Sequence, residues 1–301
     1  MTIYNQISGN KLRTFLIISL FIGFISFFFF LIGKFTGNPT SYFVIGLLFS
    51  LLSGIGSYFY SDKIVLFMTG AKPANKKEFF DFYTVAENLS IAVGIPMPKL
   101  YVIDDSAPNA FATGRDPKHA VVVATTGILQ KLERVEIEGV IAHELAHVKN
   151  YDILLMSIVS VLVGMVAFVS DWIMRGMWFK GFSRRSDKEE KGGNALMLVF
   201  FIFFLILTPI VATLIQLSIS RRREFLADAS GALMTRYPEG LARALKKISS
   251  DPHVLRSASN ATAHLFIVNP LRKKEKFISR LAGLFSTHPP VEERIRLLRE
   301  M

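Results

Sequence analysis

The chain has 301 residues, of which 51% are hydrophobic, and it carries a formal net charge of +11. Cysteine is absent, which excludes a disulfide framework as well as cysteine ligands and nucleophiles. The basic residues flank hydrophobic stretches, and no aromatic-interleaved pattern accompanies them. An anionic membrane surface therefore explains the positive charge better than nucleic acid does, and we expect no nucleic-acid partner.

Four stretches are almost free of charge and long enough for a helix of roughly 20 residues to cross a bilayer core. The first is too long for the hydrophobic part of a signal peptide, and no small-residue cleavage site follows it, so we interpret it as an uncleaved anchor. We therefore predict four transmembrane helices, at about residues 12–33, 41–60, 153–174 and 195–219.

This pattern divides the chain into four parts. Residues 1–60 hold the first two spans, and residues 153–219 form a second hairpin. The segments 61–152 and 220–301 then lie on one side of the membrane, as two parts of one catalytic domain. Of the 35 Lys and Arg residues, 28 lie on that side or at the N-terminus, which predicts a cytoplasmic location. Six basic residues in the loop 175–194 oppose this rule. Either the hairpin crosses the membrane against this local charge, or the third and fourth helices do not both cross it fully.

The water-soluble parts combine helices with short strands. Apolar periodicity predicts helices over 77–92 and 133–150, and β-branched runs predict strands over 99–103 and 119–124. The part after the fourth span is expected to be mostly helical. In the second span, one face carries small residues that either allow a close helix contact or are ordinary residues of a membrane helix: Gly46, Ser50, Ser53, Gly54 and Ser57.

The pentapeptide His143-Glu-Leu-Ala-His147 carries the clearest chemistry. On a helix, the two histidines lie one turn apart on one face, so both imidazoles can reach one Zn²⁺. Glu144 then lies beside the metal, where it can take a proton from a water that the metal activates. The alternative is a structural pair of histidines, which the intervening glutamate makes less attractive.

A peptidase zinc site needs a third protein ligand and one open position. Glu224 is the best candidate, and Asp228 lies one helical turn after it, on the same face. One carboxylate can then bind the metal while the other accepts the free N–H of a ligand histidine. The alternative for Glu224 is a surface residue paired with the three preceding arginines.

These motifs resemble those of the HtpX-type membrane zinc metallopeptidases, relatives of the prenyl-protein CAAX endopeptidases. The HELAH helix continues to Asp152, EFLAD follows the fourth span, and Thr287-His-Pro-Pro lies near the C-terminus. The resemblance covers nearly the whole length. It implies a mostly α membrane protein with four transmembrane helices, and a cytoplasmic α+β zincin-like catalytic domain that binds one Zn²⁺ per chain. The implied roles are zinc ligands for His143, His147 and Glu224, general base for Glu144, and hydrogen-bond acceptor behind a ligand for Asp228.

The resemblance also implies residues that contact the substrate. The stretch 107–114 would form an edge strand that binds an extended peptide through its main chain at Asn109, Ala110 and Phe111. Without the resemblance, the same stretch is equally compatible with a turn that ends at a glycine. His288 and Arg294 would stabilise the oxyanion of the reaction. The alternative for Arg294 is a solvated charge on a helix face.

We therefore expect a zinc endopeptidase of the cytoplasmic (inner) membrane, acting on polypeptides. The resemblance implies misfolded or damaged membrane proteins as substrates, and a role in quality control and stress response. Two alternatives remain, a CAAX-type protease that processes prenylated proteins and a catalytically silent metal-binding membrane adaptor. Glu144 argues against the adaptor, because a site that only binds metal needs no base.

Overall fold

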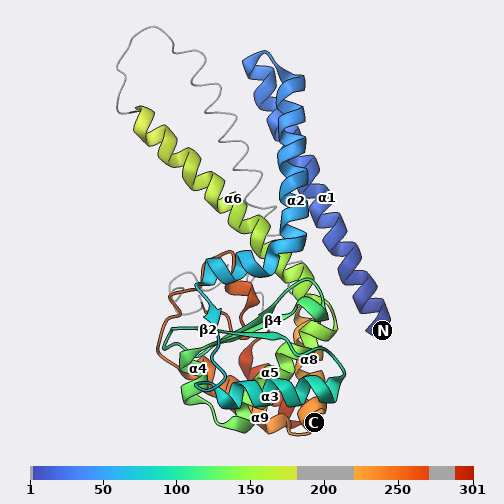
Figure 1. Cartoon of the computed structure of the whole chain (residues 1–301), viewed down its shortest axis with the longest axis vertical. Helices are drawn as coiled ribbons and strands as arrows, with labels where there is room; N and C mark the ends of the chain where they lie inside the picture. The colour runs from blue at the N-terminus through green and yellow to red at the C-terminus, as the bar shows by residue number, and fades with distance from the viewer. Residues whose placement is uncertain (1–2, 182–219, 271–288) are drawn as a thin grey trace.

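Two long apolar helices at the N-terminus pack against each other and project from the rest of the molecule (Figure 1). The computed structural model describes residues 3–181, 220–270 and 289–301. Helix α1 covers Ile3–Thr36, and helix α2 covers Pro39–Thr69. Both are apolar enough to cross a membrane, at Ile7–Lys34 and Pro39–Thr69. The first two predicted spans are thus present as helices, and α2 continues beyond the predicted end at residue 60.

The small residues predicted on one face of α2 are buried, which confirms the interpretation as a close helix contact. A methyl group added at Gly46 would lie 2.5 Å from the Cβ atom of Phe29 on α1. One added at Gly54 would lie 3.0 Å from Cγ2 of Ile18. The two helices therefore approach so closely because glycine carries no side chain at these positions.

A sharp elbow separates helix α5 (Arg134–Lys149) from helix α6 (Asp152–Gly181), and the two axes differ by 86°. The third predicted span lies within α6. The elbow contains Tyr151 with a φ of 59°, a left-handed conformation that is unfavourable for a residue with a side chain. The described ranges contain two candidate spans, or three if the bent pair counts as one. The fourth predicted span, 195–219, lies outside the described residues.

A four-stranded mixed sheet forms the centre of the globular part, with the strand order β1-β2-β4-β3. Strands β2 (Lys99–Ile103) and β4 (Val121–Thr125) are parallel and match the two predicted strands closely. Strand β3 (Ala110–Thr113) pairs antiparallel with β4 at one edge, and β1 (Lys72–Pro73) pairs antiparallel with β2 at the other.

Helices cover both faces of this sheet (Figure 1). One face packs against α5 and against α3 (Phe80–Val93), close to the predicted helix 77–92. The other face packs against the C-terminal end of α2 and the first turns of α6. The remaining helices are α4 (Thr126–Lys131), α8 (Arg221–Thr235), α9 (Pro238–Ser250) and α10 (Val291–Arg299), with short 3₁₀ turns at Pro117–His119 and Ala263–Leu265.

Strand β3 is also fastened to α6 by polar contacts. The hydroxyls of Thr113 and Ser157 lie 2.7 Å apart, and the N–H of Gly114 donates to the Ser157 hydroxyl over 3.2 Å. All three groups are buried. The edge strand thus takes its position both from β4 and from the apolar helix behind it.

The contact between α1 and α2 predicts different effects for two glycines of one helix. The substitution Gly46→Ala places a methyl group against Phe29, so the helices must separate, and we expect a loss of about 1–3 kcal/mol of stability. The matched change Gly56→Ala meets no atom within 4 Å and should leave stability unchanged or slightly higher. Thermal unfolding of both variants in detergent measures the difference. Equal midpoints would contradict the close contact.

Candidate metal centre

Helix α5 presents His143, Glu144 and His147 in the interior of the globular part, where each is less than 5% exposed. A capping box of Glu133 and Glu136 starts the helix, and its apolar face is buried in the core shared with the sheet. Because α5 is packed on several sides, the two histidines cannot move far from each other. Their Nε2 atoms lie 3.2 Å apart.

Helix α8 brings a carboxylate to the same point from the other half of the chain. The Oε2 atom of Glu224 lies 3.8 Å from Nε2 of His143, and its Oε1 atom lies 3.5 Å from Nε2 of His147. Gly231 allows this approach, because a methyl group there would lie 3.0 Å from the backbone nitrogen of His143. The predicted ligands therefore meet as one buried group.

The spacing of these atoms fits a tetrahedral metal. Zinc binds histidine nitrogen and carboxylate oxygen at about 2.0–2.2 Å, so two ligand atoms on a tetrahedron lie about 3.3 Å apart. The two nitrogens lie 3.2 Å apart, close to that value, and each has one carboxylate oxygen of Glu224 within 3.8 Å: Oε2 for His143 and Oε1 for His147. One ligand atom from each of the three residues can be chosen so that all lie within 4.8 Å of one another. The residues present thus fit a zinc ion with three protein ligands and a fourth, open position.

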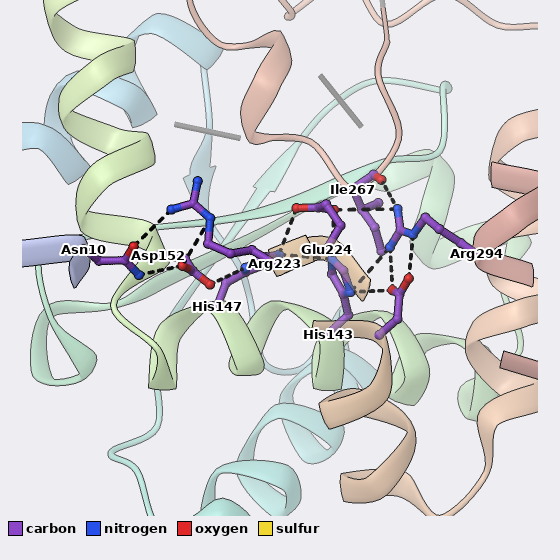
Figure 2. A network of polar contacts seen from close by, with 9 residues as sticks. Asn10, His143, His147, Asp152, Arg223, Glu224, Ile267 and Arg294 are labelled. Carbon is purple, nitrogen blue, oxygen red and sulfur yellow. Dashed lines mark hydrogen bonds and ion pairs between the residues drawn. The ribbon is translucent and has the colours of Figure 1, made fainter. Parts of the chain in front are cut away.

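Each histidine is oriented by a carboxylate behind it (Figure 2). Nδ1 of His143 lies 2.9 Å from Oδ1 of Asp228, and Nδ1 of His147 lies 3.0 Å from Oδ2 of Asp152. An imidazole that donates from Nδ1 carries its lone pair on Nε2. Two Nε2 lone pairs that face each other at 3.2 Å repel unless a cation lies between them.

The charges around the site leave room for a divalent cation. Burial alone would lower the pKa of His147, but Asp152 and Glu224 outweigh this effect and raise it to about 9. The surroundings therefore favour positive charge at this imidazole, which a metal ion supplies in place of a proton. Four buried carboxyl groups surround the histidines: Glu144, Asp152, Glu224 and Asp228. Arg223 faces Asp152, and Arg294 faces Glu224 and Asp228. When all four carboxyl groups are ionised, these two guanidinium groups balance two of the four negative charges.

Arg294 on α10 lies behind the ligands and is 1% exposed, so the interpretation as a solvated helix-face charge is wrong. Its Nε and Nη2 atoms donate to the two oxygens of Asp228 over 2.8 and 2.6 Å, and Nη1 donates to the carbonyl of Ile267 over 2.8 Å. Burial raises the pKa of Asp228, but the guanidinium outweighs burial and holds that pKa at about 2. The carboxylate that supports His143 is therefore held ionised.

Glu144 lies between the ligands and the edge strand. The backbone of Ala112 on β3 lies near its carboxylate and acts to lower its pKa. Burial raises the pKa of Glu144 to about 7. A carboxyl group with a pKa near neutrality can both accept and return a proton at physiological pH.

The three residues predicted to contact a substrate lie on or beside β3 and are buried. Phe111 is fully buried and packs edge-to-face on Phe266. The Asn109 amide donates to the carbonyl of Val268 over 2.8 Å, and the carbonyl of Ala110 accepts from the N–H of Ile267. His288, predicted to act on the oxyanion, lies outside the described residues.

Several groups at the site are absent from the sequence prediction. Ala112 contributes through its backbone, for which the sequence carries no side-chain signal. Asp152 was visible only as a residue following the metal motif, and its contact to His147 depends on the elbow at Tyr151. Asn10 and Arg223, which contact Asp152, come from distant parts of the chain.

Removal of the metal tests the charge balance. We expect a chelator to lower the thermal midpoint of the purified protein in detergent, because the buried carboxylates lose their counter-charge. Zinc added back at a hundredfold excess over its dissociation constant should restore about 2.7 kcal/mol. The variant Glu224→Gln lacks one charged ligand and should show a much smaller shift. An equal shift in both proteins would place the ion elsewhere.

Comparisons with known proteins agree with this site. The model of Peptidase family M48 matches residues 77–301. The chain is 46% identical over 298 residues to the "Protease HtpX homolog" of Tropheryma whipplei (strain Twist), covering 99% of this chain and 98% of that protein. It is 44% identical over 304 residues to the homolog of Thermoanaerobacter pseudethanolicus, with 100% and 98% covered.

A more distant relative and a solved structure extend these matches. The "Protease HtpX homolog" of Streptococcus gordonii is 39% identical over 305 residues, covering 99% of this chain and 100% of that protein. The crystal structure of S. mikatae Ste24p overlaps with a TM-score of 0.45 at 21% identity, covering 97% of this chain and 66% of that one. The family match, the full-length relatives and the buried His-His-Glu site lead to one conclusion: the chain belongs to peptidase family M48, as a membrane zinc metalloprotease homologous to HtpX.

Proposed function

We propose that this protease cleaves misfolded or damaged membrane proteins from the cytoplasmic face of the inner membrane, as part of quality control and the stress response. The observation that carries the proposal is the buried group of zinc ligands in a chain that also has helices apolar enough to cross a membrane. The elbow at Tyr151 joins the helix that holds two zinc ligands to the apolar helix α6. A substrate emerging from the bilayer would therefore meet the site close to the membrane surface.

We assign Glu144 as the general base. Zinc bound by His143, His147 and Glu224 supplies a Lewis acid that polarises the attacking water and the scissile carbonyl. Glu144 is not needed as a ligand, and its raised pKa suits a group that takes a proton from water and passes it to the leaving amine. Helix α5 packs against β3, so Glu144 faces the backbone of Ala112 on the edge strand, where the peptide would lie.

We assign β3 as the strand on which the peptide lies, with Ala112 as its central group. In an antiparallel strand, alternate peptide groups point away from the neighbouring strand. Ala110 and Ala112 point away from β4, and the Ala110 carbonyl is already bonded to Ile267. The backbone groups of Ala112 are therefore not used by β4 and would be the ones to bond the main chain of a peptide, which suits a protease with broad sequence tolerance. Asn109 lines a neighbouring cavity of about 370 Å³ that could extend this binding surface.

Asp228 and Arg294 are proposed to act through His143. The guanidinium holds both carboxylate oxygens of Asp228, which in turn fixes the ring of His143. Nη1 of Arg294 donates to the carbonyl of Ile267 and lies 3.8 Å from Oε2 of Glu224. A direct role for Arg294 on the oxyanion would use this atom, and His288 is the proposed second donor.

The domain organisation belongs to the same proposal. Residues 1–60 and 153–219 would form two membrane hairpins, and 61–152 and 220–301 would form one catalytic domain between them in the chain. The packing of α5 against α8 supports the joining of the two catalytic segments, because it brings ligands from both to one point. The positive-inside rule supports the cytoplasmic orientation.

Replacement of the base is the first test. The variant Glu144→Gln should bind zinc like the wild type, because Glu144 is not a ligand, but lose casein cleavage by about 10²–10⁴-fold. The control Glu138→Gln changes a partly exposed glutamate of the same helix and should keep activity. Retained activity in Glu144→Gln would remove the base from the mechanism. Inactivity of zinc-loaded wild type as well would favour the metal-binding adaptor.

The orientation can be tested by cysteine labelling, because the chain contains no cysteine. Ser250→Cys lies on the exposed end of α9 in the globular part, and Thr40→Cys is exposed in the first turn of α2. In intact cells stripped of any outer barrier, a membrane-impermeant maleimide should label Thr40→Cys and spare Ser250→Cys. The reverse pattern would place the catalytic domain outside the cytoplasm.

A further inference from the structure

A buried asparagine on the first membrane helix reaches the back of the metal site (Figure 2). Asn10 lies on α1 and is 3% exposed. Its Nδ2 atom donates to Oδ1 of Asp152 over 2.7 Å and to the carbonyl of Asn150 over 3.1 Å. Its Oδ1 atom accepts from Nη1 of Arg223 over 3.1 Å. Both sides of the amide are therefore engaged, and the orientation of its nitrogen and oxygen is fixed.

The two oxygens of Asp152 have different partners. Oδ2 faces Nδ1 of the zinc ligand His147 at 3.0 Å, whereas Oδ1 faces Asn10 and Nε of Arg223, at 2.7 and 3.7 Å. A carboxylate held at one oxygen can still rotate about its Cβ–Cγ bond. The contact from Asn10 removes this freedom and so determines how the other oxygen meets the imidazole.

Helix α1 also contacts the elbow between α5 and α6, and this elbow brings Asp152 into place. Tyr151 has a left-handed backbone, which turns the chain so that Asp152 faces back toward His147. Asn10 bonds the carbonyl of Asn150 just before this turn, and Nζ of Lys11 lies 4.7 Å from the centre of the Tyr151 ring. Two successive residues of α1, Asn10 and Lys11, thus stabilise the left-handed backbone conformation at Tyr151, which is unfavourable on its own.

We propose that Asn10 is a positioning residue of the zinc site. Docking of α1 onto the elbow fixes Asp152, and Asp152 fixes the ring of His147. The first membrane helix then completes the metal centre as well as anchoring the protein. This inference rests on the assignment of His147 as a zinc ligand, and it does not depend on which substrate the protease cleaves.

The first experiment removes the amide and measures zinc binding directly. Full-length Asn10→Leu in detergent should bind zinc about tenfold more weakly in competition with a chromogenic chelator, at the lower end of the effect of groups behind a ligand. Its kcat on casein should fall while KM stays the same. The control Thr14→Val alters a buried residue one turn along α1 whose hydroxyl has no hydrogen-bond partner among the described residues, and it should match the wild type.

A swap of the two side chains separates positioning from general loss of structure. Asn10→Asp alone sets two carboxylates against each other, and Asp152→Asn alone sets two amides between His147 and Arg223. In the double variant, the amide at position 152 can accept from His147 and donate to the carboxylate at position 10. We expect the double variant to recover most of the zinc affinity that the single variants lose.

Two results would overturn the proposal. One is wild-type zinc affinity and kcat in a folded Asn10→Leu. The other is a double variant whose loss of zinc affinity equals the sum of the single losses, and this result decides the question if Asn10→Leu does not fold. Zinc affinity is measured without substrate, so this test does not depend on cleavage. A wild type that binds zinc but cleaves nothing would contradict the proposed function, and the comparison of zinc affinities would still decide the role of Asn10.

Discussion

The burial of charge around two histidines is the constraint on which the rest of the structure depends. An ionised carboxylate in a protein interior is strongly unfavourable unless it is paired or bound to a metal. Here the carboxylates of Glu224, Asp228 and Asp152 are buried together, and each faces an imidazole or a guanidinium. Helices α1, α5, α6, α8 and α10 each contribute at least one member of this network. Assembly of the helices and assembly of the site are therefore one event.

Each zinc-ligand histidine is supported by a carboxylate, but the two carboxylates are held by residues from different parts of the chain. Behind His143, Asp228 on α8 is held by Arg294 on α10. Behind His147, Asp152 is held by Asn10 from the first membrane helix. One ligand is thus supported from within the globular part and the other from the membrane side. The zinc site lies at the junction of the two regions rather than inside either one.

Sequence reasoning was reliable where chemistry follows from local spacing. The pairs His143 with His147 and Glu224 with Asp228 lie one helical turn apart, so a helix alone brings each pair to one face. The small residues of α2 were likewise recognisable from their period, although only the structure shows that they contact α1. Strand β4 was predicted because it is rich in β-branched residues, and β2 because a short apolar run follows the Gly- and Pro-containing break at 94–98.

The rest depends on tertiary placement that no local pattern records. Arg294 shares its helix with Arg296, which is exposed, and the sequence does not distinguish a buried arginine from an exposed one. The role of Asp152 requires positive φ at Tyr151, a position where glycine or asparagine would be the usual signal. Ala112 acts through its backbone. Asn10 is 142 positions from its partner Asp152, and only the folded chain brings them together.

The hydroxyl contact between Ser157 and Thr113 makes the edge strand β3 sensitive to the angle of α6. Ser157 lies five residues beyond Asp152, about 7.5 Å along the helix from the elbow. A helix that pivots at Tyr151 by about 10° displaces Ser157, and the strand attached to it, by about 1.3 Å. Misplacement of a reacting group by about 1 Å can lower a rate by about 10²-fold. Since helices tilt to match the thickness of the bilayer, a change of lipid composition would reach the edge strand through the contacts of Ser157 with Thr113 and Gly114.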